Sequence, residues 1–267
     1  IRDKTLLDEI FWTAISLKEK IDCVIHFAGL KAVEESINEP LKYWDANVNG
    51  TITLLEVMKK YHCKKIIFSS SATLYGNKEI QSPIKEDSFI KPINTYGKTK
   101  ETIENILYSL SERKSHNWKI AILRYFNPIG AHPSGIIGED PKMIPTNILP
   151  IINQVALGKK EILEIYGNDW NTYDGTCIRD YIHVVDLAEG HLKALEYITN
   201  NDSKSQFLKL NLGTGNGVSV LELVHTFEKI NKVQVPFKFA SRREGDIPYS
   251  VADNSLAKKI IQWSPKY

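Results

Sequence analysis

Apolar and polar positions follow two recurring patterns along the first half of the chain. Short continuous apolar runs are typical of buried strands, and longer segments with apolar residues three and four positions apart are typical of helices. Strands that alternate with helices predict an α/β fold, a parallel sheet covered by helices on both faces. The patterns place helices at residues 4–20, 40–62 and 94–113 and strands at residues 22–28, 64–70 and 119–126.

The pattern changes at about residue 128. Glycine and proline crowd residues 130–145, which indicates a loop and a domain junction. We therefore expect two domains, residues 1–127 and residues 128–267. The elements expected in the second domain are shorter, with helices near residues 145–157, 186–199 and 218–231 and strands near residues 162–166 and 207–212.

Composition narrows the classes of function. The net charge of +2, from 34 basic and 32 acidic residues, gives no hint of a nucleic-acid partner. The three cysteines are few and widely separated, which favours a reduced, cytoplasmic setting over a disulfide framework. The histidines show no spacing typical of a metal site, so we expect no metal. No apolar run is long enough to span a membrane, and no signal peptide is recognisable.

Tyr96 and Lys100 lie four residues apart in a predicted helix and would share one of its faces. A tyrosine alone is a poor base, because its hydroxyl has a pKa near ~10, but a nearby lysine cation favours the phenolate. Such a pair can take a proton from an alcohol. The spacing alone also fits an ordinary amphipathic helix with a surface lysine, so the interpretation depends on the rest of the chain.

Small and polar residues follow three of the predicted strands, at residues 27–31, 69–71 and 125–127. Parallel sheets bind ligands beyond the carboxyl ends of their strands. We therefore expect a ligand site at this edge of the sheet, where Gly29 permits a close approach of the backbone.

Six segments occur in a fixed order along the chain: Phe27–Lys31, Ser69–Thr73, Tyr96–Lys100, Arg124–Gly135, Arg179–His183 and Arg242–Asp246. Together they resemble the UDP-glucose 4-epimerases (UDP-galactose 4-epimerases) of the extended short-chain dehydrogenase/reductase superfamily. The Tyr-x-x-x-Lys segment identifies only the superfamily, whereas the fourth and fifth segments are far more specific to the epimerases. The resemblance covers nearly the whole chain.

The resemblance implies a Rossmann-type doubly wound sheet and an isomerase that uses NAD. Residues 1–127 would form an incomplete NAD-binding domain, and residues 128–267 would mainly bind the UDP-sugar. UDP-glucose and UDP-galactose would be interconverted by inversion at C4 through a 4-keto intermediate. The resemblance also suggests a homodimer formed through the helices at residues 40–62 and 94–113.

The same resemblance assigns roles to individual residues. Tyr96 would take the proton of the sugar 4-hydroxyl, Ser71 would hydrogen-bond the 4-oxygen, and Lys100 would lower the Tyr96 pKa. The residues expected to contact NAD are Phe27, Ala28, Gly29, Leu30, Lys31, Asn47, Ser71, Tyr96, Lys100 and Phe126. The residues expected to contact the UDP-sugar are Ser71, Tyr96, Asn127, Asn147, Ile148, Leu149, Glu164, Ile165, Tyr166, Arg179, Arg243, Asp246 and Ser250.

Two departures from the family pattern stand out, in the opening of the chain and at Ala46-Asn47. The family opens with a strand and a glycine-rich turn for the NAD pyrophosphate, and this chain does not, so the chain alone is expected to bind NAD weakly or not at all. The glycine-dense run at residues 213–217 falls in the second half and is assigned no cofactor role. The family often has Asn-Asn where this chain has Ala46-Asn47, so Asn47 is the candidate retained there.

Ser250 predicts a broader substrate range. In the resembled family a bulky tyrosine at this position restricts some members to unmodified hexoses, and a serine leaves space for the N-acetylhexosamine pair.

Two other functions remain open. A nucleotide-sugar 4,6-dehydratase would need an Asp-Glu pair where this chain has Ala72 and Thr73. A non-catalytic NAD-binding scaffold would not need Ser71, Tyr96 and Lys100 together.

Overall fold

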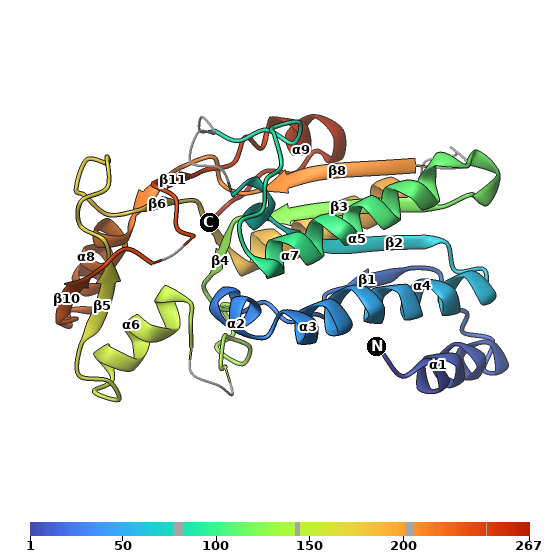
Figure 1. Cartoon of the computed structure of the whole chain (residues 1–267), viewed down its shortest axis with the longest axis horizontal. Helices are drawn as coiled ribbons and strands as arrows, with labels where there is room; N and C mark the ends of the chain where they lie inside the picture. Colours follow the sequence, from blue (N-terminus) through green and yellow to red (C-terminus); the bar gives the residue numbers. More distant parts are fainter. Residues whose placement is uncertain (77–82, 142–144, 201–205, 244) are drawn as a thin grey trace.

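The computed structural model describes residues 1–76, 83–141, 145–200, 206–243 and 245–267. Its largest sheet has four parallel strands in the order β1-β2-β3-β8 (Figure 1). These strands are β1 (Val24–His26), β2 (Lys65–Ser71), β3 (Lys119–Tyr125) and β8 (Gln206–Leu212). The pairing aligns Ser71 with Tyr125 and Tyr125 with Leu212, so the carboxyl ends of the three longer strands lie in one row.

Helices cover both faces of this sheet, because its buried strands point alternate side chains to opposite faces. In β2, Ile66 and Phe68 pack with α1, α4 and α5, whereas Ile67 packs with α7 and α9. The predicted α/β fold class is therefore confirmed. The covering helices are α1 (Lys4–Ser16), α4 (Gly50–Lys60), α5 (Thr95–Glu112), α7 (Val184–Asn200) and α9 (Ser255–Ile261).

A smaller lobe lies beyond the carboxyl ends of the large sheet (Figure 1). Its core packs α6 and α8 against β5. Short strand pairs complete it and join it to the large sheet. Its elements are β4 (Asn127–Ile129), α6 (Ile148–Ala156), β5 (Leu163–Tyr166), β6 (Ile178–Arg179), β7 (Tyr181–His183), β9 (Val218–Ser219), α8 (Val220–Asn231), β10 (Phe237–Ala240) and β11 (Tyr249–Ser250).

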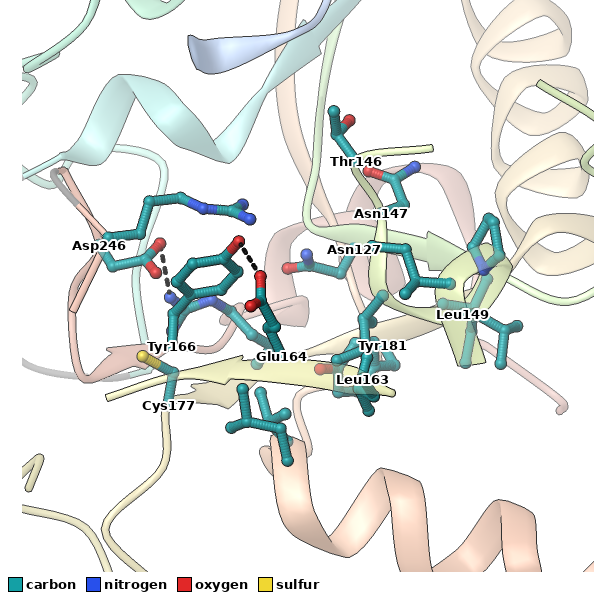
Figure 2. A pocket seen from close by; sticks show the side chains of 18 of the residues that line it. Asn127, Thr146, Asn147, Leu149, Leu163, Glu164, Tyr166, Cys177, Tyr181 and Asp246 are labelled. Atoms are coloured by element: carbon teal, nitrogen blue, oxygen red, sulfur yellow. Dashed lines mark hydrogen bonds and ion pairs between the residues drawn. The ribbon is translucent and has the colours of Figure 1, made fainter. Parts of the chain in front are cut away.

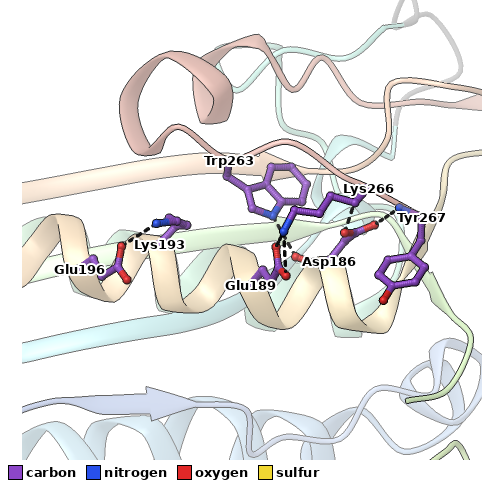
Figure 3. Close-up of polar contacts among 7 residues, drawn as sticks. All are labelled: Asp186, Glu189, Lys193, Glu196, Trp263, Lys266 and Tyr267. Atoms are coloured by element: carbon purple, nitrogen blue, oxygen red, sulfur yellow. Dashed lines mark hydrogen bonds and ion pairs between the residues drawn. The ribbon is translucent and has the colours of Figure 1, made fainter. Parts of the chain in front are cut away.

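The second half of the chain also contributes to the large sheet, through β8, α7 and α9. The division of the chain at residue 127 remains a proposal, and in the structure the chain crosses back to the sheet after that point. The segment after α9 packs on α7 (Figure 3). There the Asp186 carboxylate accepts hydrogen bonds from the backbone N–H groups of Lys266 and Tyr267 at 2.9 and 3.0 Å.

Two predicted helices differ most from their expected bounds. The helix predicted at residues 4–20 ends at Ser16, where Lys18 adopts a positive φ of 61° and stops the helical path. The helix predicted at residues 40–62 is divided into α3 (Pro40–Tyr43), a π-helical segment η1 (Trp44–Asn49) and α4. Such π segments are often found at functional sites. The short helices α2 (Val33–Asn38), η2 (Ala72–Tyr75) and η3 (Lys114–His116) were not predicted.

Helix α5 begins where the sequence provides a cap. The side chain of Asn94 accepts a hydrogen bond from the backbone N–H of Gly97 at 2.8 Å and so satisfies a free donor of the first turn. This start places Tyr96 in the first turn of α5, at the edge of the sheet where β2 and β3 end. Within the described residues, no helix is long and apolar enough to cross a membrane.

Candidate active site

The structure brings the three expected catalytic side chains together at the end of β2. Tyr96 and Lys100 are both buried on α5, and the Lys100 Nζ lies 5.7 Å from the centroid of the Tyr96 ring. The same Nζ donates a hydrogen bond of 2.7 Å to the backbone carbonyl of Ser69. Ser71, two residues further along β2, lies within hydrogen-bonding reach of the Tyr96 side chain.

Burial dominates the proton affinities of this cluster. It raises the pKa of Tyr96, and only the hydrogen bond with Ser71 acts in the opposite direction. Burial also lowers the pKa of Lys100 to about 8, although the Glu104 carboxylate opposes this change. The direction for Tyr96 is therefore opposite to the lowering by Lys100 that the sequence suggested.

The loop after β1 lies against this cluster, and Asn47 holds it there. The Asn47 side chain accepts a hydrogen bond from the Leu30 N–H at 2.7 Å and donates one to the Leu30 carbonyl at 3.0 Å. A Cβ atom at Gly29 would come within 3.1 Å of the Asn47 Oδ1 and 3.9 Å of the Lys100 Nζ. A larger residue at position 29 would therefore crowd the Asn47 side chain that holds the loop, whereas its distance to Lys100 would be an ordinary contact.

The remaining expected cofactor contacts lie around this loop. Phe27 and Ala28 are exposed, and the Phe27 ring lies 4.8 Å from the His191 ring. The Lys31 Nζ is 3.9 Å from the Glu139 carboxylate. Phe126 is buried directly after β3.

A cavity of about 230 Å³ opens beside β4, β5 and the first turn of α6 (Figure 2). Most of the residues expected to contact the UDP-sugar line it, and they come from segments that are far apart in the sequence. Ser71, Tyr96 and Ser250 do not line it. The expected residues in its wall are Asn127, Asn147, Ile148, Leu149, Glu164, Ile165, Tyr166, Arg179, Arg243 and Asp246.

Two guanidinium groups face this cavity from different strands and loops. Arg179 lies 3.4 Å from the Asp246 carboxylate and donates a hydrogen bond of 2.7 Å to the carbonyl of Ile247. The Arg243 guanidinium lies 4.3 Å from the centroid of the Tyr166 ring. The cavity thus combines cationic, amide and aromatic groups, which suits an anionic ligand with a flat ring.

Sequence reasoning missed several residues in the cavity wall. Glu139 accepts a hydrogen bond from the Asn147 side chain at 2.9 Å, but its position in a loop rich in glycine and proline gave no signal. Cys177 and Tyr181 also line the cavity, and their place within or beside the Arg179–His183 segment could have indicated them. Ser250 is buried on β11, paired with Arg179 of β6.

Similarity to known proteins agrees with this arrangement. A family model described as GDP-mannose 4,6 dehydratase matches residues 1–267. The UDP-glucose 4-epimerase of Bacillus subtilis (strain 168) is 53% identical over 261 residues, which are 98% of this chain and 76% of that protein. The chain belongs to the UDP-glucose 4-epimerase family.

Two UDP-glucose 4-epimerases of known structure are similar to the whole chain. The enzyme from Stenotrophomonas maltophila, with bound NAD and formylated UDP-arabinopyranose, is 42% identical with a TM-score of 0.92. The enzyme from Bifidobacterium longum, in complex with NAD+ and UDP, is 44% identical with a TM-score of 0.91. Each similarity covers 100% of this chain and 76% of the other.

Membership of the epimerase family weighs against the dehydratase alternative. Although the matching family model is described as a dehydratase, Ala72 and Thr73 occupy the positions of the Asp-Glu pair that a dehydratase needs. Both lie in η2, directly after Ser71, and neither can transfer a proton as a carboxylate does.

The glycine-dense run at residues 213–217 is held in place by hydrogen bonds to a carboxylate from another part of the chain, Asp180. Asp180 is fully buried and accepts hydrogen bonds from the N–H groups of Thr214 at 2.7 Å and Gly215 at 2.9 Å. Backbone donors of a glycine-rich turn are the groups that would cradle a phosphate, and here a protein side chain occupies them. Within the described residues, no cluster of histidine, cysteine and carboxylate side chains could hold a metal ion.

Proposed function

We propose that the protein interconverts UDP-glucose and UDP-galactose by inverting C4 of the hexose, with NAD as its cofactor. One observation carries the proposal. The cavity that combines Arg179, Arg243 and Asn127 begins where β3 ends, and Ser71 ends the neighbouring strand beside Tyr96. A UDP group in the cavity would leave its sugar pointing toward the Tyr96 hydroxyl.

The cofactor would lie over the carboxyl ends of β1 and β2. The absence of a side chain at Gly29, and the Asn47 hydrogen bonds that hold the loop, fit a group that the backbone approaches closely. Phe27–Lys31, Asn47 and Phe126 would hold it, and Lys100 would contact its ribose. A bound NAD would supply the hydride chemistry at C4 of the sugar.

The protein's own groups move the proton. Tyr96 would accept the proton of the 4-hydroxyl while Ser71 hydrogen-bonds the same oxygen and holds it in place. Because burial raises the Tyr96 pKa, the phenolate requires a positive charge close to its oxygen when it accepts this proton. Lys100 would supply this charge, since its Nζ lies 5.7 Å from the centroid of the Tyr96 ring and the Ser69 carbonyl anchors it at the same edge of the sheet.

The UDP group would be held by charge and stacking. The forked guanidinium groups of Arg179 and Arg243 match phosphate oxygens, and Asn127 and Asn147 can donate to the same group. The Tyr166 ring offers a face for the uracil base.

Conversion of UDP-galactose to UDP-glucose tests the proposal. The full-length protein is incubated with UDP-galactose, and UDP-glucose dehydrogenase reports the product as NADH. We expect turnover without loss of mass from the sugar. A product lighter by one water would identify a dehydratase, and the absence of any turnover by a protein that holds NAD would favour the scaffold.

We further propose that the N-acetylhexosamine pair is a substrate, because Ser250 is small and lies beside Arg179 on the neighbouring strand. Steady-state assays with UDP-N-acetylglucosamine should show turnover, and Ser250→Tyr should remove it while UDP-glucose turnover continues. No detectable reaction of the N-acetyl sugar with the unmodified protein would contradict this.

We also propose that the protein acts in the cytoplasm as a homodimer. Three described cysteines are free thiols, which suits a reducing compartment.

The homodimer would form through helices that expose apolar surface. The exposed side chains on α3, α4 and α5, the helices expected at the dimer interface, are Leu41, Ile52 and Tyr108. Light scattering after size-exclusion chromatography would give the mass of the particle, and a monomer at micromolar concentration would contradict the dimer.

A further inference from the structure

Three residues of α5 contact three consecutive residues of β2. Tyr96, Lys100 and Glu104 are spaced by four and lie along one stripe of the helix. Tyr96 meets the Ser71 hydroxyl, Lys100 donates to the Ser69 carbonyl, and Glu104 accepts a hydrogen bond of 2.6 Å from the Ser70 hydroxyl. The third contact involves no group of the proposed chemistry.

Glu104 is fixed in place by a second partner. The Arg124 guanidinium on β3 binds both carboxylate oxygens of Glu104, with distances of 2.9 and 2.6 Å. Ser70 and Arg124 are paired across β2 and β3, so the carboxylate is held by two neighbouring strands. All three side chains are buried.

The hydrogen bonds of Glu104 and Arg124 continue across the sheet, one residue before the row of strand ends where Ser71 lies. Arg124 also donates to the Tyr75 hydroxyl at 2.8 Å, and Tyr75 donates to the Asn211 side chain of β8 at 2.7 Å. The row that pairs Ser70, Arg124 and Asn211 across three strands lies one residue before the row of Ser71 and Tyr125. A buried ion pair adds little net stability, because desolvation offsets the attraction, but its two parallel bonds fix geometry tightly.

We propose that Glu104, held by Ser70 and Arg124, is a positioning residue that sets the register of α5 against β2, and with it the approach of the Tyr96 hydroxyl to Ser71. The inference rests on the proposed function. It adds that the reaction depends on a carboxylate two helical turns from the proton-transfer group, which touches neither substrate nor cofactor.

Ser70→Ala is the sharpest test, because it removes one bond to Glu104 and leaves the ion pair with Arg124 intact. The full-length protein is compared with Ser70→Ala, with Ser70→Thr, which keeps the hydroxyl, and with Ile198→Val. Ile198 is a buried residue in the last turn of α7, so this variant loses packing stability away from the site. The melting temperature of each variant is measured first, and kcat and KM for UDP-galactose are then measured at a temperature below the lowest of them.

We expect Ser70→Ala to lose about tenfold or more in kcat, since small displacements of reacting groups are costly, while KM stays within about twofold. Ser70→Thr should regain most of the kcat, and Ile198→Val should keep it despite a similar fall in melting temperature. A kcat for Ser70→Ala equal to that of Ile198→Val would overturn the inference, as would a threonine variant no better than alanine. An unmodified protein without turnover would instead remove the proposed function itself.

Discussion

Replacing Asp180 by asparagine tests how the chain secures the turn between β8 and β9. One carboxylate oxygen accepts from the Thr214 N–H and hydroxyl, both at 2.7 Å. The other accepts from the N–H groups of Gly215 at 2.9 Å and Ala252 at 3.1 Å. Asp180 lies between β6 and β7 and is fully buried, so these four bonds tie the turn and the end of β11 to the cavity wall.

The expected loss follows from the number of donors left without an acceptor. Asparagine keeps one oxygen, and its NH₂ group then faces the N–H groups of Gly215, which is exposed to solvent, and of Ala252, which is buried. The N–H of Gly215 can turn to water, whereas the buried N–H of Ala252 cannot. An unsatisfied buried donor costs about 1–3 kcal/mol, so Asp180→Asn should lower the free energy of unfolding by about that amount. That is a large share of the stability of an ordinary domain, about 5–15 kcal/mol.

Urea unfolding followed by circular dichroism measures this loss. Asp253→Asn is the matched control, because Asp253 is partly exposed and accepts one backbone hydrogen bond, from the Ser255 N–H at 2.9 Å. The control should lose less than about 1 kcal/mol. If the two variants lost the same small amount, the reasoning that Asp180 satisfies the turn would be refuted.

Two further predictions concern acid stability and the nucleotide site. Burial lowers the pKa of His26 to about 4, whereas a histidine in the unfolded chain binds a proton below pH ~6.5. The free energy of unfolding therefore falls as the pH is lowered from about 6.5 to about 4. The loss in the free energy of unfolding approaches about 3 kcal/mol. In His26→Gln the urea midpoint should change less with pH across this window. An unchanged dependence on pH would exclude His26 as the cause. Arg243→Ala should weaken UDP binding about 10–100-fold by calorimetry, because it removes a charge-assisted contact in the cavity. Arg242→Ala is the control, since Arg242 pairs with Asp169 at 2.7 Å outside the cavity wall, and equal losses in the two variants would contradict the assignment.

The large sheet could be predicted because its strands are continuous apolar runs between amphipathic helices. The strands predicted at residues 64–70 and 119–126 became β2 and β3, with each end shifted by a residue or less, whereas the strand predicted at residues 22–28 is shortened to β1. The two-residue strands β6, β9 and β11 could not be predicted, because so short a segment has no periodicity. The π-helical segment η1 could not be predicted either, because the buried hydrogen bonds of Asn47 that accompany it are made to residues far away in the sequence.

The candidate site also contains some residues that sequence motifs mark and others that only the folded structure reveals. Residues within the recognised segments, such as Arg179 and Asp246, line one cavity, and their contact with a UDP-sugar stays a prediction. Glu139 and the Ser70–Glu104 contact depend on how loops and helices pack, and no local pattern marks them. The pKa of Tyr96 was expected to fall beside a cation, but its direction depends on burial, which is a property of the folded chain.

Turnover of UDP-galactose by Tyr96→Phe tests the central claim most directly. The change removes one hydroxyl from a buried ring and leaves the packing of α5 in place. The account predicts that kcat falls by about 10²–10⁴-fold, the usual contribution of a positioned acid or base, while the NAD content of the purified full-length protein is unchanged. A phenylalanine variant that holds NAD and turns over at a rate close to that of the unmodified protein would contradict it.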